Sequence, residues 1–135
     1  MAVWQATFEF QSTADFPSDF RERLSRIAPS LASWASDLEM WGTEVGDRVD
    51  VWLENGLPSE ARVRFDLRAP SEAFWLSIAQ FAAAANTNLM TETGLPVPPR
   101  LAELAAALEG SRAARFIEDP ARYFNRLRAG GLEDV

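Results

Sequence analysis

The chain has 135 residues, 47% of them hydrophobic and 24% charged, which is the size and composition of one globular domain. It contains neither Cys nor His, and all 13 basic residues are Arg. These absences exclude disulfides, thiolate nucleophiles, imidazole bases, His-ligated zinc and lysine-based chemistry. The formal charge of -7 disfavours binding to nucleic acid or to an anionic membrane and suits a basic partner.

The N-terminal third predicts a strand followed by a helix. Residues 3–10 alternate apolar and polar side chains, the period of a strand with one buried face. Residues 18–19 (Ser-Asp) suit the start of a helix whose apolar residues recur at helical spacing: Phe20, Leu24 and Ile27. Pro29 is expected to end or kink that helix, and residues 30–34 would then form a short second helical piece.

The middle of the chain carries the clearest strand signal. Two runs around a loop at residues 55–60 alternate apolar with charged side chains, and we expect them to pair as a β-hairpin. A third strand precedes them and enters the hairpin through a turn at Gly46-Asp47. The three predicted strands cover residues 38–45, 48–54 and 62–68.

The length of the turn before the hairpin decides which way Trp41 faces. A two-residue turn at Gly46-Asp47 places Trp41 opposite Trp52 on the charged face of the sheet. A three-residue loop would instead turn Trp41 inward, opposite Val51, because a slip of one residue moves every side chain to the other face. The turn preferences of hairpins favour the paired tryptophans.

The C-terminal half predicts mainly helices. Ser71 suits the N-cap of a core helix that ends near residues 86–88. The elements expected after it are a short edge strand (residues 89–92), a rigid Pro-rich connection (94–99), a helix (101–108) ended by Gly110, a further turn or two capped by Ser111 and reaching Phe116 and Ile117, and a last helix starting at Asp119-Pro120.

This order of elements predicts one α+β domain over residues 1–135. We expect a two-layer sandwich, in which an antiparallel sheet of four to five strands has helices packed on one face and extra helices at the C-terminus. A ferredoxin-like variant is one way to connect them. The N-terminus shows no signal-peptide pattern, and the Ala and Arg richness without Lys is typical of a GC-rich bacterial genome. A soluble, cytoplasmic bacterial protein is therefore expected.

The charged face of the sheet is the first candidate site. The candidate interface residues are Trp41, Arg48, Asp50, Trp52, Arg62, Arg64, Asp66 and Arg68. A solvated face crossed by weak ion pairs would explain the charges but not the tryptophans. Trp and Arg are enriched at the centres of protein interfaces, which favours binding of a second copy or of another protein. Coverage by the chain's own C-terminal helix is a third interpretation.

Three other groups of residues are weaker candidates for a site. The acidic pairs lack metal-loop spacing, the basic residues of the C-terminal part suit helix ends, and the proline run at residues 96–99 is only a weak match to a PxxP ligand. No catalytic residue, metal or cofactor is therefore expected. The acidic pairs are Asp15 with Asp19, Asp37 with Glu39, Glu44 with Asp47 and Glu118 with Asp119, and the basic residues are Arg112, Arg115, Arg122, Arg126 and Arg128.

The leading hypothesis is a non-enzymatic, acidic interaction protein that forms a homodimer or binds another protein through the charged sheet face. An antitoxin or immunity role, in which a small acidic protein masks a basic enzyme, fits the charge and size. The alternative hypothesis is a small-molecule binding domain or a carboxylate-dependent enzyme, with its pocket between the sheet and the helices.

Overall fold

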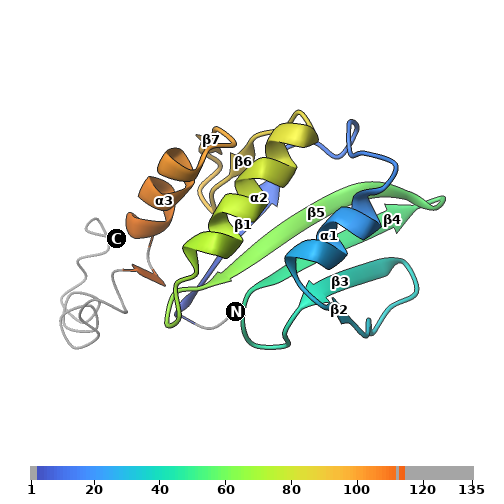
Figure 1. The fold of residues 1–135 in the computed structure, drawn as a ribbon, viewed down its shortest axis with the longest axis horizontal. Coiled ribbons are helices and arrows are strands. Elements are labelled where there is room, and N and C mark those ends of the chain that lie inside the picture. Colours follow the sequence, from blue (N-terminus) through green and yellow to red (C-terminus); the bar gives the residue numbers. More distant parts are fainter. Residues whose placement is uncertain (1–2, 112, 115–135) are drawn as a thin grey trace.

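A computed structural model describes residues 3–111, 113 and 114 of the chain. Over these residues seven strands form one antiparallel sheet, and three helices lie on one of its faces (Figure 1). The α+β class is confirmed, with seven strands in place of four to five. The strands are β1 (Gln5–Phe10), β2 (Ser30–Leu31), β3 (Leu38–Gly42), β4 (Arg48–Glu54), β5 (Leu57–Asp66), β6 (Leu89–Met90) and β7 (Pro96–Val97), and the helices are α1 (Phe20–Ile27), α2 (Glu72–Ala84) and α3 (Leu101–Glu109).

The strands lie in the order β2-β3-β4-β5-β1-β6-β7. The β4–β5 hairpin turns on Asn55 and Gly56, whose φ angles of 53° and 78° are those that a two-residue type I′ turn requires. The hairpin is therefore tighter than the expected loop at residues 55–60. Between Trp52 and Leu53 the pairing with β5 shifts by one residue, because a β-bulge adds one residue to β5 at that point.

The predicted pairing of Trp41 with Trp52 is wrong. In the structure Trp41 pairs with Val49, and residues 43–47 form a five-residue loop between β3 and β4. An odd-length loop turns Trp41 toward the helices, where it is 3% exposed and its Nε1 donates to Ser25 Oγ at 3.1 Å. Trp41 is thus a core residue. Trp52 lies on the opposite face, across from Leu38.

The second helical piece predicted at residues 30–34 is also wrong. Ala28 already has extended backbone angles, and Pro29 accepts a hydrogen bond from Gly42 N–H at 2.7 Å. The chain therefore enters β2, which pairs with β3. The Pro-rich connection likewise contains a strand, β7, which pairs with β6. Each of these strands has two residues, too few to carry a period.

The core lies between the sheet and the helices. Apolar residues of β1, β4 and β5 pack against α1 and α2, and several aromatic rings meet edge to face, as Phe65 does with Phe8 and Phe74. Ser71 caps α2 as predicted, since its Oγ accepts from Phe74 N–H at 3.2 Å. The turn expected through Phe116 and Ile117, the last helix and the five C-terminal arginines lie outside the described residues.

Candidate functional site

The face of the sheet opposite the helices, here called the outer face, carries six of the eight predicted site residues. By strand register they are Arg48, Asp50 and Trp52 on β4 and Arg62, Arg64 and Asp66 on β5. Arg68 follows β5, while Trp41 is buried on the other side. Arg64 and Asp66 lie toward one end of the hairpin and Trp52 and Arg62 toward the other, while Arg48 and Asp50 form an ion pair in the middle.

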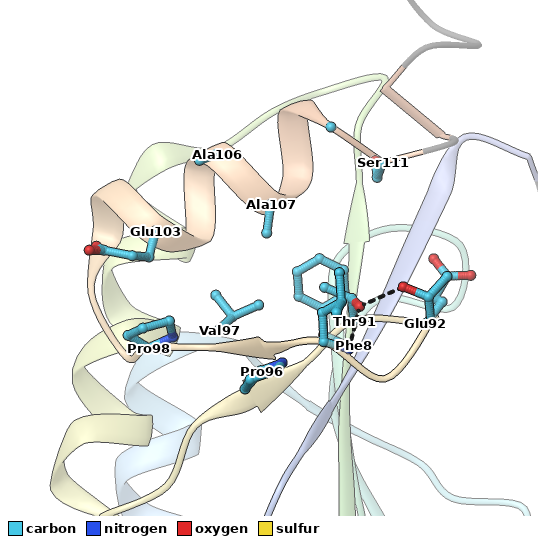
Figure 2. A pocket seen from close by; sticks show the side chains of 13 residues that line it. Phe8, Thr91, Glu92, Pro96, Val97, Pro98, Glu103, Ala106, Ala107 and Ser111 are labelled. Carbon is cyan, nitrogen blue, oxygen red and sulfur yellow. Dashed lines mark hydrogen bonds between the residues drawn. The ribbon is translucent and has the colours of Figure 1, made fainter. Parts of the chain in front are cut away.

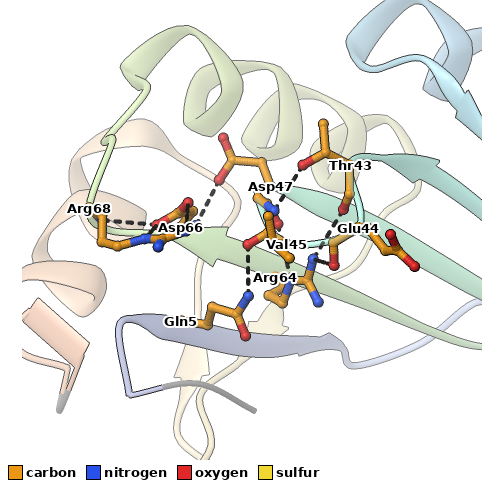
Figure 3. A network of polar contacts seen from close by, with 9 residues as sticks. Gln5, Thr43, Glu44, Val45, Asp47, Arg64, Asp66 and Arg68 are labelled. Atoms are coloured by element: carbon orange, nitrogen blue, oxygen red, sulfur yellow. Dashed lines mark hydrogen bonds and ion pairs between the residues drawn. The ribbon is translucent and has the colours of Figure 1, made fainter.

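Arg64 holds the loop between β3 and β4 (Figure 3). Its Nε donates to the carbonyl of Gly46 at 3.0 Å, and its Nη2 donates to the carbonyls of Thr43 at 3.1 Å and Glu44 at 2.7 Å. Burial lowers the pKa of Arg64, and the positive charge of Arg48, directly across on β4, lowers it further. All these donors serve the chain's own backbone, so Arg64 has a structural role.

Other side chains complete this attachment of the loop. Gln5 Nε2 donates to the carbonyl of Val45 at 2.8 Å, and Asp66 N–H donates to Asp47 Oδ1 at 2.8 Å. Burial raises the pKa of Asp47 above its ordinary value, although the hydrogen bond from Asp66 N–H opposes this shift. We call residues 43–47 with Gln5, Arg64, Asp66 and Arg68 the loop end.

Arg68 and Asp66 form an ion pair at the margin of the loop end. Arg68 Nη2 lies 3.0 Å from Asp66 Oδ2, and Arg68 Nε donates to Asp66 Oδ1 at 3.1 Å. These hydrogen bonds lower the pKa of Asp66. The Arg68 guanidinium also lies 4.1 Å from the centre of the Trp4 ring, a cation–π contact. Both charges are therefore neutralised within the chain.

A second ion pair lies in the middle of the outer face. Arg48 Nε is 2.8 Å from Asp50 Oδ1, and Arg48 Nη2 donates to Asp50 Oδ2 at 3.1 Å. Their side chains are only 21% and 13% exposed. Arg48 Nε and Asp50 Oδ1 are buried and close enough for charge attraction, but they form no hydrogen bond with each other, so one hydrogen bond and the ion pair hold the two groups together. Because both side chains are largely covered, a partner has little access to them.

The other end of the hairpin is more accessible. Arg62 lies 4.9 Å from the centre of the Trp52 ring and 3.4 Å from Glu9 Oε1, and its side chain is 44% exposed. Next to it, the backbone carbonyl of Asp37 accepts a hydrogen bond from Leu53 N–H at 2.7 Å, which brings the end of the β2–β3 loop to the hairpin. That loop exposes Trp34 (76%), and the tip exposes Leu57 (69%). We call Trp34, Trp52, Leu57 and Arg62 the tip end.

A pocket of about 670 Å³ lies between β1, the β6–β7 segment and α3 (Figure 2). The alternative hypothesis from the sequence included a pocket between the sheet and the helices but identified none of its lining residues. Strands of two residues, such as β6 and β7, show no periodic pattern from which those residues could be predicted. The residues that line it are Phe8, Thr91, Glu92, Thr93, Leu95, Pro96, Val97, Pro98, Glu103, Ala106, Ala107, Gly110 and Ser111.

The acidic pairs considered from the sequence have other partners in the structure. Asp19 pairs with Arg23 at 2.8 Å, Glu39 pairs with Arg21 at 2.7 Å, and Asp15 accepts from Asn86 at 3.1 Å. Among the described residues no group of three or more acids is placed to hold a metal ion. The pair Glu118 and Asp119 lies outside those residues.

Comparisons with protein-family models, with curated proteins and with solved structures found no match for this chain. Within the part of the chain that the structure describes, none of the helices combines the length and the apolar character needed to cross a membrane.

Proposed function

We propose that this chain is a non-enzymatic protein that binds another protein, either a second copy or a basic partner, through its tip end. The observation that carries the proposal is the exposure of Trp34 on the β2–β3 loop and of Leu57 at the hairpin tip, together with the stacked pair Trp52 and Arg62. Trp and Arg are the residue types that most often dominate binding energy at interfaces. An exposed Trp on a loop at the end of a sheet is a ready anchor for a partner.

The rest of the predicted interface has a different use. Arg64, Arg48 and Arg68 each have partners within the chain, and a bound protein would have to break those contacts to recruit them. The proposed binding surface is therefore the tip end alone and not the whole outer face.

The charge of -7 supports a basic partner, because an acidic protein accelerates encounter with a basic one. An antitoxin or immunity role in the bacterial cytoplasm is the form of the proposal that fits this charge and the small size. The order β4-β5-β1-β6, with α1 and α2 on one face, supports a ferredoxin-like fold, a scaffold that serves many functions and does not select one.

The test compares three variants with the wild type. Trp34→Ala and Trp52→Ala remove the aromatic anchors, and Leu76→Ala removes an apolar side chain that is 41% exposed on α2. Light scattering over a concentration series first establishes whether the chain self-associates. If it does not, the tagged chain is used to capture a basic partner, and its affinity for each variant is measured by calorimetry.

We expect Trp34→Ala and Trp52→Ala each to weaken association about tenfold or more, the effect of losing an interface anchor. Leu76→Ala should leave association unchanged. A wild type that stays monomeric and binds no partner, or a partner that binds all three variants equally, would contradict the proposal.

A further inference from the structure

The pocket at the β1 edge has an apolar part, and small side chains form one of its walls. Phe8, Val97 and Ala107 point into it from β1, β7 and α3 (Figure 2). On α3, Leu104 and Leu108 fill the core and are at most 1% exposed, whereas the helix presents Ala106 and Ala107 to the pocket. Alanines at these positions leave the space open. Its volume of about 670 Å³ is in the range of small-molecule sites.

A turn at residues 91–95 builds one polar end of the pocket. β6 pairs with β1 only at Glu9 and Phe10, after which the chain turns back into β7. Leu95 N–H donates to Thr91 Oγ1 at 3.0 Å, and Thr91 N–H donates to the Leu95 carbonyl at 2.9 Å. These two hydrogen bonds fix the turn that carries Glu92, which lies next to the apolar part of the pocket.

Among the described residues, the charged side chains that line the pocket are both acidic. Glu103 has a cationic neighbour, Arg100, at 3.4 Å. Glu92 Oε1 accepts from Thr7 N–H at 3.3 Å, and its second oxygen, Oε2, has no hydrogen-bond partner among the described residues. No basic residue is among the thirteen that line the pocket. Glu92 is thus the group with capacity for a ligand, and it selects a positive charge.

We propose that this pocket binds a small organic cation, an apolar body carrying one protonated amine. The body lies against Phe8, Val97 and Ala107, and the ammonium group pairs with the Glu92 carboxylate. The site is separate from the tip end, so the two proposals stand or fall independently. The net charge of the chain adds to the preference, because it attracts cations and repels anions.

The experiment uses three probes with one apolar body and different head groups: 4-phenylbutylamine, 4-phenylbutanol and 4-phenylbutanoate. Titrations of the full chain are followed by calorimetry and by shifts of its backbone amide NMR signals. We expect the amine to bind most tightly and the carboxylate most weakly, with about a tenfold span between them because both attraction and repulsion act at a partly solvated carboxylate.

Two variants test the assigned residues. Glu92→Gln keeps an acceptor for Thr7 N–H and removes the charge, so it should weaken the amine about threefold and leave the alcohol unchanged. Glu109→Gln, an exposed change on α3 outside the pocket lining, should affect neither probe. Ala107→Phe should abolish binding of all three probes, because the larger side chain would fill the apolar part of the pocket.

Several results would overturn the proposal: no binding of the amine at millimolar concentration, equal binding of amine and carboxylate, or equal losses in Glu92→Gln and Glu109→Gln. Circular dichroism and thermal melting establish that each variant is folded. Should Ala107→Phe fail to fold, the pair of Glu variants still decides the matter, since both are near-isosteric changes at exposed positions.

Discussion

The two ends of the outer face are built from the same two strands and from similar residues, yet they differ in what their arginines contact. At the loop end, Arg64 donates to three backbone carbonyls of residues 43–47. At the tip end, Arg62 lies over Trp52 and remains 44% exposed. A guanidinium that satisfies carbonyls shapes the fold, whereas one stacked on a ring still presents its edges to a partner.

Because Arg64 binds backbone carbonyls, the loop end needs a fixed backbone. Arg62 stacks on a side chain, so the tip end does not. Residues 43–47 cross the outer face toward β1, where Gln5 holds Val45 (Figure 3). The hairpin tip, by contrast, is a two-residue turn with open space around it. Glycines at the two ends test this contrast directly.

The largest effect is expected from Gly42→Ala. Gly42 has φ of +129°, and an added Cβ would meet the Asp47 carbonyl oxygen and the Arg48 Cα, at 2.8 Å from the latter. Backbone has to move, so we expect a loss of about 3 kcal/mol or more in the free energy of unfolding. Urea denaturation measures it.

Gly56→Ala is the matched control at the tip end. Gly56 also has a positive φ, +78°, but nothing lies within 4 Å of an added Cβ. Only the strain of the left-handed backbone remains, about 1 kcal/mol. Equal losses in the two variants would show that residues 43–47 are not packed as the loop end requires.

The second effect compares the two arginines. Arg64→Ala leaves the carbonyls of Thr43, Glu44 and Gly46 without their donor, and we expect a loss of about 1–2 kcal/mol because water can replace part of these bonds. Arg62→Ala removes a solvated cation–π contact and a long ion pair, and should cost about 0.5 kcal/mol. Urea denaturation of both variants at one pH makes the comparison, and a larger loss for Arg62→Ala would reverse the assignment.

Local patterns in the sequence predicted much of the fold. The alternation in residues 3–10 and 48–54 and the Ser71 cap identified β1, β4 and α2, because each signal spans a full strand or a helix start. The two-residue strands carry no such signal. The sequence also placed residues 30–34 in a helix, since it could not show that β3 offers an edge for Ser30 to pair with.

The candidate site was predicted only in part, for a different reason. Alternation assigned Arg48, Arg62 and Arg64 correctly to one face, but it gives no information on which of them meets a carbonyl, a carboxylate or a ring. Arg64 meets the loop of residues 43–47 and Arg62 meets residues of two other strands, whereas Arg48 pairs with Asp50 on its own strand. The orientation of Trp41 depended on the length of one loop, which turn preferences alone could not determine.

The third effect is a pH dependence of opposite sign for two acids of the loop end. The pKa of Asp66 is lowered, so its ionised form contributes stability above pH 3.8 that is lost as the pH falls below that value. The pKa of Asp47 is raised, so the folded chain binds its proton more tightly, and stability falls as the pH rises above 3.8.

Substitution by Asn separates the two acids. At pH 7 Asp66→Asn should lower the free energy of unfolding by up to about 1 kcal/mol, since its partner Arg68 is solvated. Asp47→Asn keeps an acceptor for Asp66 N–H and should raise stability by a similar or smaller amount. Both differences should shrink below pH 3.8 in urea titrations at pH 3, 5 and 7. Effects of the same sign at pH 7 would contradict the assignment.

The smallest effect on stability, and the most direct probe of the tip end, is Trp34→Phe. Trp34 is 76% exposed, whereas Trp41 and Trp75 are 3% and 7% exposed, so acrylamide should quench Trp34 most strongly. The variant should lose the most quenchable part of the emission while its unfolding free energy changes by less than about 0.5 kcal/mol.

Trp41→Phe, the control, should remove emission that acrylamide scarcely reaches. If a partner covers the tip end, its addition should protect wild-type emission from quenching more than that of Trp34→Phe, in which Trp52 is the one tryptophan of the tip end left to protect. Equal protection in both would place the partner away from Trp34.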